Sequence, residues 1–129
     1  MSAPADLQHL FILLKRELAE YDNRLKVITD NDKRYELIFD SPFQFAGKTY
    51  PRLYFSAASV EKNYVTLHFF PIYSHPRQFD DLPERLRKTL KGKSCFNFKK
   101  LDEQLIEEIR HMLDQGFELY SKAAGSVNA

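Results

Sequence analysis

The sequence predicts a single α+β domain: an antiparallel sheet of about five strands with helices on one face, in the order α-β-β-β-β-α-β-α. Segments near both ends of the chain have the three- and four-residue apolar periodicity of amphipathic helices. Between them lie short β-branched and aromatic runs separated by turn residues, which is typical of hairpin-connected strands. The 129 residues suit one domain. We expect a core over about 4–122 and a disordered tail over 123–129.

Composition narrows the class of protein. Hydrophobic residues make up 43% of the chain and aromatic residues 14%, enough to form a buried core. The net charge of only +1 argues against nucleic acid or an anionic membrane as a partner. A single cysteine excludes an internal disulfide and a Cys-rich zinc site. No apolar run approaches the roughly 20 residues that span a bilayer, and no basic leader is present, so we expect a cytoplasmic protein.

The elements follow in order along the chain. A stripe of apolar residues predicts a first helix at about 4–22: Leu7, Leu10, Phe11, Leu14, Leu18 and Tyr21. Strands are predicted at 25–29, 34–40, 52–58 and 63–70, paired as two hairpins, with loops at 43–49 and 71–78.

A short helix and a fifth strand complete the sheet region. Leu82, Leu86 and Leu90 share one helical face, Asp80 or Asp81 can cap that helix, and Gly92 suits its end. A fifth strand is predicted at 93–98. Asp102 then caps a last helix, in which Gly116 introduces a kink or an end.

Strand alternation collects polar and aromatic side chains on one face of this sheet. In strand 63–70, Leu67 and Phe69 point to the helices while His68 points away. In strand 52–58, Ala57 is expected on the helix side and Ala58 opposite. The face away from the helices then gathers Arg52, Tyr54, Ser56, Tyr64, Thr66, His68, Lys93, Cys95 and Asn97, with Phe43, Phe45 and Tyr73 from loops as walls.

We interpret this face as the surface with which a small-ligand-binding or protein-interaction domain holds its partner. A solvated face, or one buried in a homodimer, fits the same pattern. The predicted ligand-binding residues are Arg52, Tyr54, Tyr64, Thr66, His68, Tyr73, Lys93, Cys95 and Asn97. No cofactor and no metal site is predicted, because the four histidines lack metal-ligand spacing.

Two motifs suggest other chemistry. Gly92-Lys93-Ser94 resembles the end of a phosphate-binding loop, but position 87 is Arg rather than Gly, and a helix precedes the glycine where a strand is required. Cys95 and His68 are candidates for a thiol–imidazole pair, for which no acidic third member is evident on that face. A thiol-dependent enzyme is therefore an alternative function, and a non-catalytic domain is favoured.

The segments 64–73 and 92–98 also carry a family resemblance. Their Tyr-Val-Thr-Leu-His-Phe-Phe-Pro-Ile-Tyr and Gly-Lys-Ser-Cys-Phe-Asn-Phe runs resemble the YdhG-like family of bacterial domains of unknown function, over roughly 25–120. The Glu-x-Ile-Ser-Tyr-x-x-Pro segment of that family is missing here. The resemblance implies a compact α+β fold similar in outline to frataxin. Some relatives are called intracellular iron chaperones, which gives a second alternative function.

Overall fold

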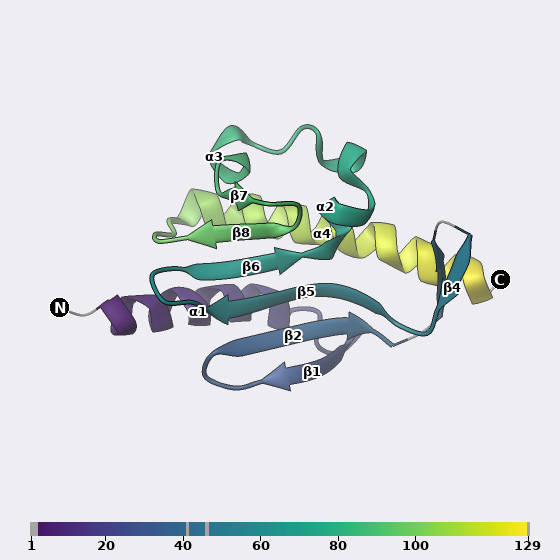
Figure 1. Ribbon diagram of the computed structural model, residues 1–129, viewed down its shortest axis with the longest axis horizontal. Helices are drawn as coiled ribbons and strands as arrows, with labels where there is room; N and C mark the ends of the chain where they lie inside the picture. Colours follow the sequence, from purple (N-terminus) through teal and green to yellow (C-terminus); the bar gives the residue numbers. More distant parts are fainter. Residues whose placement is uncertain (1–2, 41, 46, 129) are drawn as a thin grey trace.

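The computed structural model describes residues 3–40, 42–45 and 47–128, and it confirms the α+β fold (Figure 1). The helical segments are α1 Ala3–Ala19, α2 Phe70–Ser74, η1 Pro76–Phe79 (a 3-10 helix), α3 Glu84–Arg87 and α4 Glu103–Asn128. The strands are β1 Lys26–Asp30, β2 Arg34–Phe39, β3 Phe43–Phe45, β4 Lys48–Tyr50, β5 Leu53–Val60, β6 Val65–Phe69, β7 Leu90–Lys91 and β8 Cys95–Phe98.

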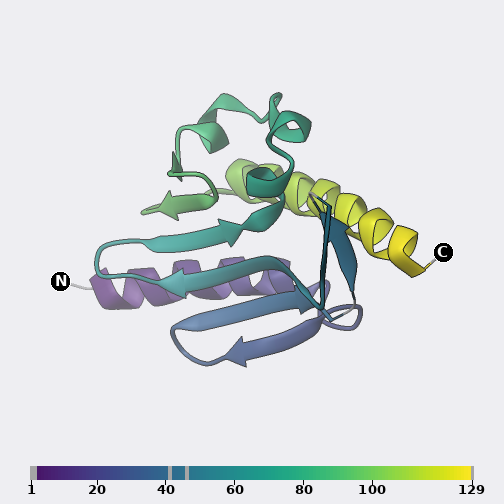
Figure 2. The ribbon, with the colours of Figure 1, turned by 45° about the vertical axis from the view of Figure 1, so that its right-hand side comes forward.

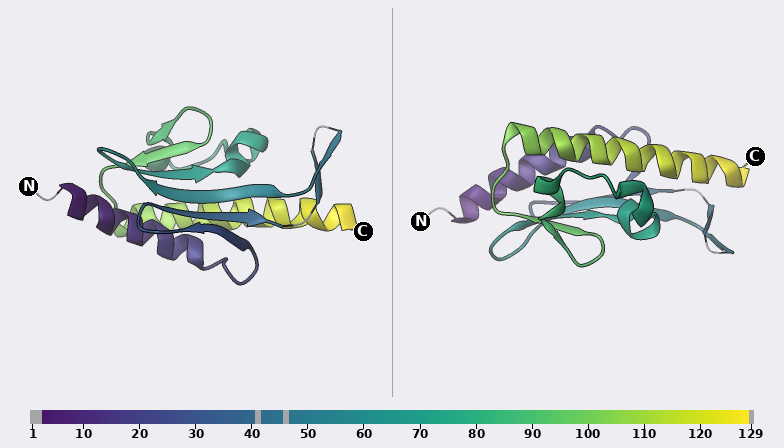
Figure 3. Two further views of the ribbon diagram at one scale, coloured as in Figure 1. Left: turned by 60° about the horizontal axis from the view of Figure 1, so that its bottom comes forward. Right: turned by 90° about the horizontal axis from the view of Figure 1, so that it is seen from above.

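Six strands form one antiparallel sheet in the order β1-β2-β5-β6-β8-β7. This sheet has one strand more than predicted, because the short β7 pairs with β8. The long helices α1 and α4 lie together on one face of the sheet, as the view from above shows (Figure 3). The opposite face, away from both helices, is called the outer face below.

Buried apolar stripes and polar contacts hold the terminal helices α1 and α4 against the sheet. The first-helix stripe predicted from the sequence is buried, although α1 itself ends at Ala19 and Tyr21 lies in the turn that follows. Asp102 caps α4 as predicted, since its Oδ1 accepts the backbone N–H of Leu105 at 2.8 Å. The Tyr21 hydroxyl donates to Asp114 of α4. These contacts hold the two helices against the same layer.

Three local predictions were wrong for identifiable reasons. The predicted loop 43–49 contains the β3–β4 hairpin, which stands beside the C-terminal half of α4 (Figure 2). The predicted loop 71–78 is mostly helical, because proline suits the first turn of α2 and of η1. The helix predicted over Leu82, Leu86 and Leu90 is only α3, after which Leu90 enters β7.

Two glycines have roles other than those expected. Gly92 has a positive φ of 78°, as predicted, but it turns the chain between β7 and β8 rather than ending a helix. Gly116 neither kinks nor ends α4, which continues to Asn128 through the residues expected to be a tail. Ala129 lies outside the described residues. Within the part of the chain that the structure describes, no helix has the length and apolarity needed to cross a membrane.

Candidate functional site

A β-bulge in β5 decides which side chains reach the outer face. In the β2–β5 pairing, Leu37 lies opposite Ser56 and Ile38 opposite Tyr54, so Phe55 is the extra residue. The bulge reverses the alternation after Phe55. Ala57, paired with His68, therefore lies on the outer face, and Ala58 packs in the core opposite Leu67, contrary to the sequence prediction.

The structure brings five of the predicted site residues together on the outer face. Thr66 lies opposite Asn97 and His68 opposite Cys95 in the β6–β8 pairing, and Tyr54 projects from β5 on the same side. The Thr66 hydroxyl donates to Asn97 Oδ1 at 2.8 Å. These side chains come from three neighbouring strands, which makes them one continuous surface.

Three of the remaining predicted residues lie at the ends of strands, and the fourth lies in a helix. Arg52 directly precedes β5, Tyr64 is in the bend before β6, and Lys93 is in the turn between β7 and β8. Tyr73 lies in α2, where the Lys93 ammonium approaches its ring to 6.0 Å. Ser56 was predicted on the outer face, but the bulge places it on the core side, opposite Leu37 and Phe69. Ser56 is buried, and its hydroxyl donates to the backbone carbonyl of His68 at 2.5 Å. The side chains of Phe43 and Phe45 lie outside what the structure describes.

A chain of four polar side chains crosses this surface: Cys95, His68, Ser59 and Glu61. Cys95 Sγ lies 3.5 Å from His68 Nδ1, and His68 Nε2 lies 3.1 Å from Ser59 Oγ. The Ser59 hydroxyl donates to Glu61 Oε2 at 2.8 Å. Glu61, in the β5–β6 turn, is therefore an acidic member linked to the thiol–imidazole pair through a serine, which the sequence prediction did not include.

The proton positions in this network follow from the chemistry of its ends. An ionised carboxylate can only accept hydrogen bonds, so the single Ser59 hydroxyl proton points to Glu61. Ser59 Oγ must then accept from His68, which places the imidazole proton on Nε2. His68 Nδ1 consequently carries a lone pair and faces the Cys95 thiol as an acceptor.

The charge state of His68 agrees with this assignment. Burial lowers the pKa of His68 below its usual value, and the nearby Arg34 guanidinium lowers this pKa further. Glu61 and Glu36 act in the opposite direction but do not reverse the shift. The imidazole is therefore neutral at pH 7 and available to accept a proton.

We expect this neutral histidine to make folding stability depend on pH. In the unfolded chain His68 takes up a proton near a pKa of about 6.5, but the folded protein resists protonation until lower pH. Its stabilising effect is therefore complete above about pH 7 and is lost as the pH falls below about 6.5. Urea unfolding at pH 7.5 and at pH 5 should show a larger loss of unfolding free energy for the wild type than for His68→Gln. An equal loss in both proteins would contradict this assignment.

A small pocket opens on the outer face beside His68. Its volume is about 150 Å³, and it is lined by Arg34, Glu36, Tyr54, Phe55, Ser56, Ala57, His68, Phe69, Phe70 and Ser94. The Arg34 guanidinium lies 3.3 Å from a Glu36 carboxylate oxygen, so the two charges at the pocket compensate each other. Among the described residues, the hydroxyls of Tyr54 and Ser94 have no hydrogen-bond partner. Tyr54 is 48% exposed, and its ring is free to contact a ligand.

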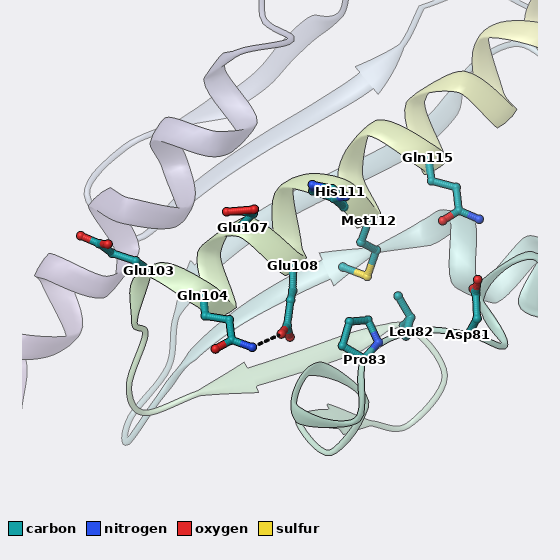
Figure 4. Close-up of a pocket in the computed structure, with 10 residues that line it drawn as sticks. All are labelled: Asp81, Leu82, Pro83, Glu103, Gln104, Glu107, Glu108, His111, Met112 and Gln115. Atoms are coloured by element: carbon teal, nitrogen blue, oxygen red, sulfur yellow. Dashed lines mark hydrogen bonds between the residues drawn. The ribbon is translucent and has the colours of Figure 1, made fainter.

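A larger cavity of about 620 Å³ lies elsewhere, between α4 and the segment before α3 (Figure 4). Leu82, Pro83 and Met112 form its apolar part, and carboxylates surround it. Figure 4 shows Gln104 bonded to Glu108, whose other carboxylate oxygen is buried without a partner. Glu103, Glu107 and Glu108 of α4 thus line this cavity. No group of three or more His, Cys, Asp or Glu side chains in the described chain is placed to hold a metal ion.

Sequence reasoning missed the residues that complete the outer-face site: Ser59, Glu61, Arg34, Glu36, Phe70 and Ser94. The predicted strand 52–58 stops short of Ser59, whereas β5 runs to Val60. The apolar, β-branched Val60 is a signal for the longer strand. That signal does not place Ser59 in the site, because unbroken alternation puts Ser59 on the helix side, and only the bulge brings it to the outer face opposite Thr66.

Comparison of the chain with protein-family models, with curated protein sequences and with solved structures gives no match. The resemblance to the YdhG-like family, together with the iron-chaperone role that it implies, therefore stays a prediction from the sequence.

Proposed function

We propose that this protein is a cytoplasmic, non-catalytic binding domain that holds a small, uncharged, polar ligand in the outer-face pocket. This proposal is carried by the pocket itself, which is lined by the exposed Tyr54, by Ser94 and by the neutral imidazole of His68. Sites of this kind combine apolar and aromatic walls with a few polar groups that orient the ligand.

The dimensions of the pocket support a ligand about the size of one aromatic ring. A cavity of about 150 Å³ accommodates benzene in other proteins, and the pocket here has the same volume. The compensation of Arg34 by Glu36 favours a ligand without net charge. Both nitrogens of His68 are already engaged with Ser59 and Cys95, so Tyr54 and Ser94 supply the hydrogen bonds to the ligand.

The proposal is tested by titrating the ¹⁵N-labelled protein with phenol, which combines one ring with one hydroxyl. We expect amide shifts centred on Tyr54, Phe70 and Ser94, with a Kd on the order of 1 mM, since so small a molecule gains only a few kcal/mol on binding. Tyr54→Ala should weaken phenol binding at least tenfold, because it removes both the ring and one of the two free hydroxyls.

Tyr73→Ala is the matched control. Tyr73 is 49% exposed, much like Tyr54, but it does not line the pocket. Equal loss of binding in both variants, or shifts confined to other surfaces, would contradict the proposed site. Shifts at the same residues that depend on protein concentration rather than on phenol would instead identify a homodimer surface.

A further inference from the structure

We propose that Cys95 is a nucleophilic thiol for which His68 is the base, with Ser59 and Glu61 as positioning residues, and that it captures small conjugated carbonyl compounds covalently. This inference rests on the proposed function, because it assigns the ligand class of the same outer face. It concerns a single addition to the protein and requires no turnover.

The geometry contains the parts that an activated nucleophile needs. A thiol faces an unprotonated ring nitrogen at 3.5 Å, and the other ring nitrogen is held by a hydroxyl that a carboxylate orients in turn. This is the arrangement of nucleophile, base and orienting group found in thiol and hydroxyl nucleophiles generally. Cys95 is free and partly exposed, so a reagent can reach its sulfur. The depressed pKa of His68 keeps the base in its neutral form at pH 7.

The surrounding backbone favours addition over acyl transfer. Acyl transfer needs free backbone N–H groups that bind a tetrahedral oxyanion. Here β8 lies between β6 and β7, and Cys95 is paired with His68 on one side and Lys91 on the other. The backbone at Cys95 thus belongs to the sheet ladder. In conjugate addition the negative charge develops on the enolate oxygen, four bonds away from the sulfur, so free N–H groups at the Cys95 backbone are not required.

The addition balances without a co-reactant. The Sγ–H proton moves to His68 Nδ1, and a sulfur lone pair forms an S–C bond to the β-carbon of the unsaturated carbonyl compound. The electrons of the carbon–carbon double bond move to give an enolate. The enolate α-carbon then takes the proton from His68 Nδ1, which restores the neutral imidazole and leaves a thioether at Cys95.

The experiment measures the second-order rate of alkylation of Cys95 by N-ethylmaleimide, a conjugated carbonyl probe, by intact-protein mass spectrometry from pH 5.5 to 9.5. For the wild type we expect rapid alkylation at pH 7, because His68 Nδ1 takes the thiol proton as the sulfur attacks the probe. The groups that face His68 and affect its capacity to accept this proton are Cys95, Arg34, Glu36 and Glu61. His68→Gln should slow the reaction at pH 7 at least tenfold, because it removes the base.

Glu61→Gln provides a second variant, because it lies in an exposed turn and leaves the sheet intact. We expect a smaller loss of rate at pH 7, about threefold, whereas Lys62→Gln in the same turn should leave the rate unchanged. An unreactive thiol, or equal rates in wild type and His68→Gln, would each overturn the inference. Phenol titration of Cys95→Ser separates the two proposals: retained binding with an unreactive Cys95 leaves the binding function standing and removes only the covalent step.

Discussion

Phe55→Ala should lower the free energy of unfolding by about 3–5 kcal/mol, the usual cost of deleting a large ring from a packed core. Phe55 is fully buried, and its ring lies 5.6 Å from that of Tyr21, 5.9 Å from Phe39 and 6.1 Å from Phe69. It also meets Phe117 and Tyr120 of α4. One side chain thus joins the central strands to α4 and to the turn after α1. Urea unfolding at pH 7.5 measures the loss.

The adjacent Tyr54→Ala is the control for this change. Tyr54 comes from the same strand but projects to the outer face, where it is 48% exposed, so its removal should change stability by no more than about 0.5 kcal/mol. Phe55→Leu should recover much of the loss, since it restores most of the buried volume. Similar destabilisation by Phe55→Ala and Tyr54→Ala would show that the two side chains do not lie on opposite faces of the sheet as described.

The contrast between these neighbours also shows how far the sequence predicts the fold. Apolar alternation correctly separates Leu53 and Phe55 from Tyr54, because the reversal caused by the bulge begins only after Phe55. Alternation fails from Ser56 to Ala58, since one extra residue in β5 exchanges the two faces. These three side chains are all small, so the sequence pattern does not show the exchange. Pattern reasoning assumes an uninterrupted strand, and only the pairing with β2 reveals the interruption.

The sequence prediction missed the short elements β7 and α2 for a different reason. The strand β7 has only two residues and forms through its pairing with β8. A segment this short has no periodicity from which a strand could be predicted. Helix α2 has five residues and follows β6 without a break, at a proline that signals either a loop or a helical first turn. Whether the segment after this proline is a loop or a helix is decided by its tertiary contacts. The long helices were predictable because each carries several turns of one apolar stripe.

The candidate site was partly predictable for the same reason. Strand alternation alone places His68 and Cys95 on one face, and the structure then sets them opposite each other. The link to Glu61 depends on how the β5–β6 turn folds back over Ser59, which the sequence pattern does not encode. The ion pair of Arg34 with Glu36 comes from β2, a strand that the prediction left out of the site.

Gly116→Ala should destabilise the protein by about 1–3 kcal/mol, the range typical of overpacked cores, although helix propensity favours alanine over glycine by about 1 kcal/mol. A Cβ at this position would lie 2.5 Å from Phe69 Cζ and 2.9 Å from Pro71 Cγ, inside van der Waals contact. The Phe69 ring is fully buried and packs edge-on against Phe79 at 5.2 Å, so it has little room to withdraw.

Glu118→Ala, at an exposed position two residues along α4, should change stability by no more than about 0.5 kcal/mol. Since the clash and the propensity act in opposite directions, urea unfolding of Gly116→Ala decides between them: a more stable variant would mean that α4 does not approach β6 as closely as the structure shows.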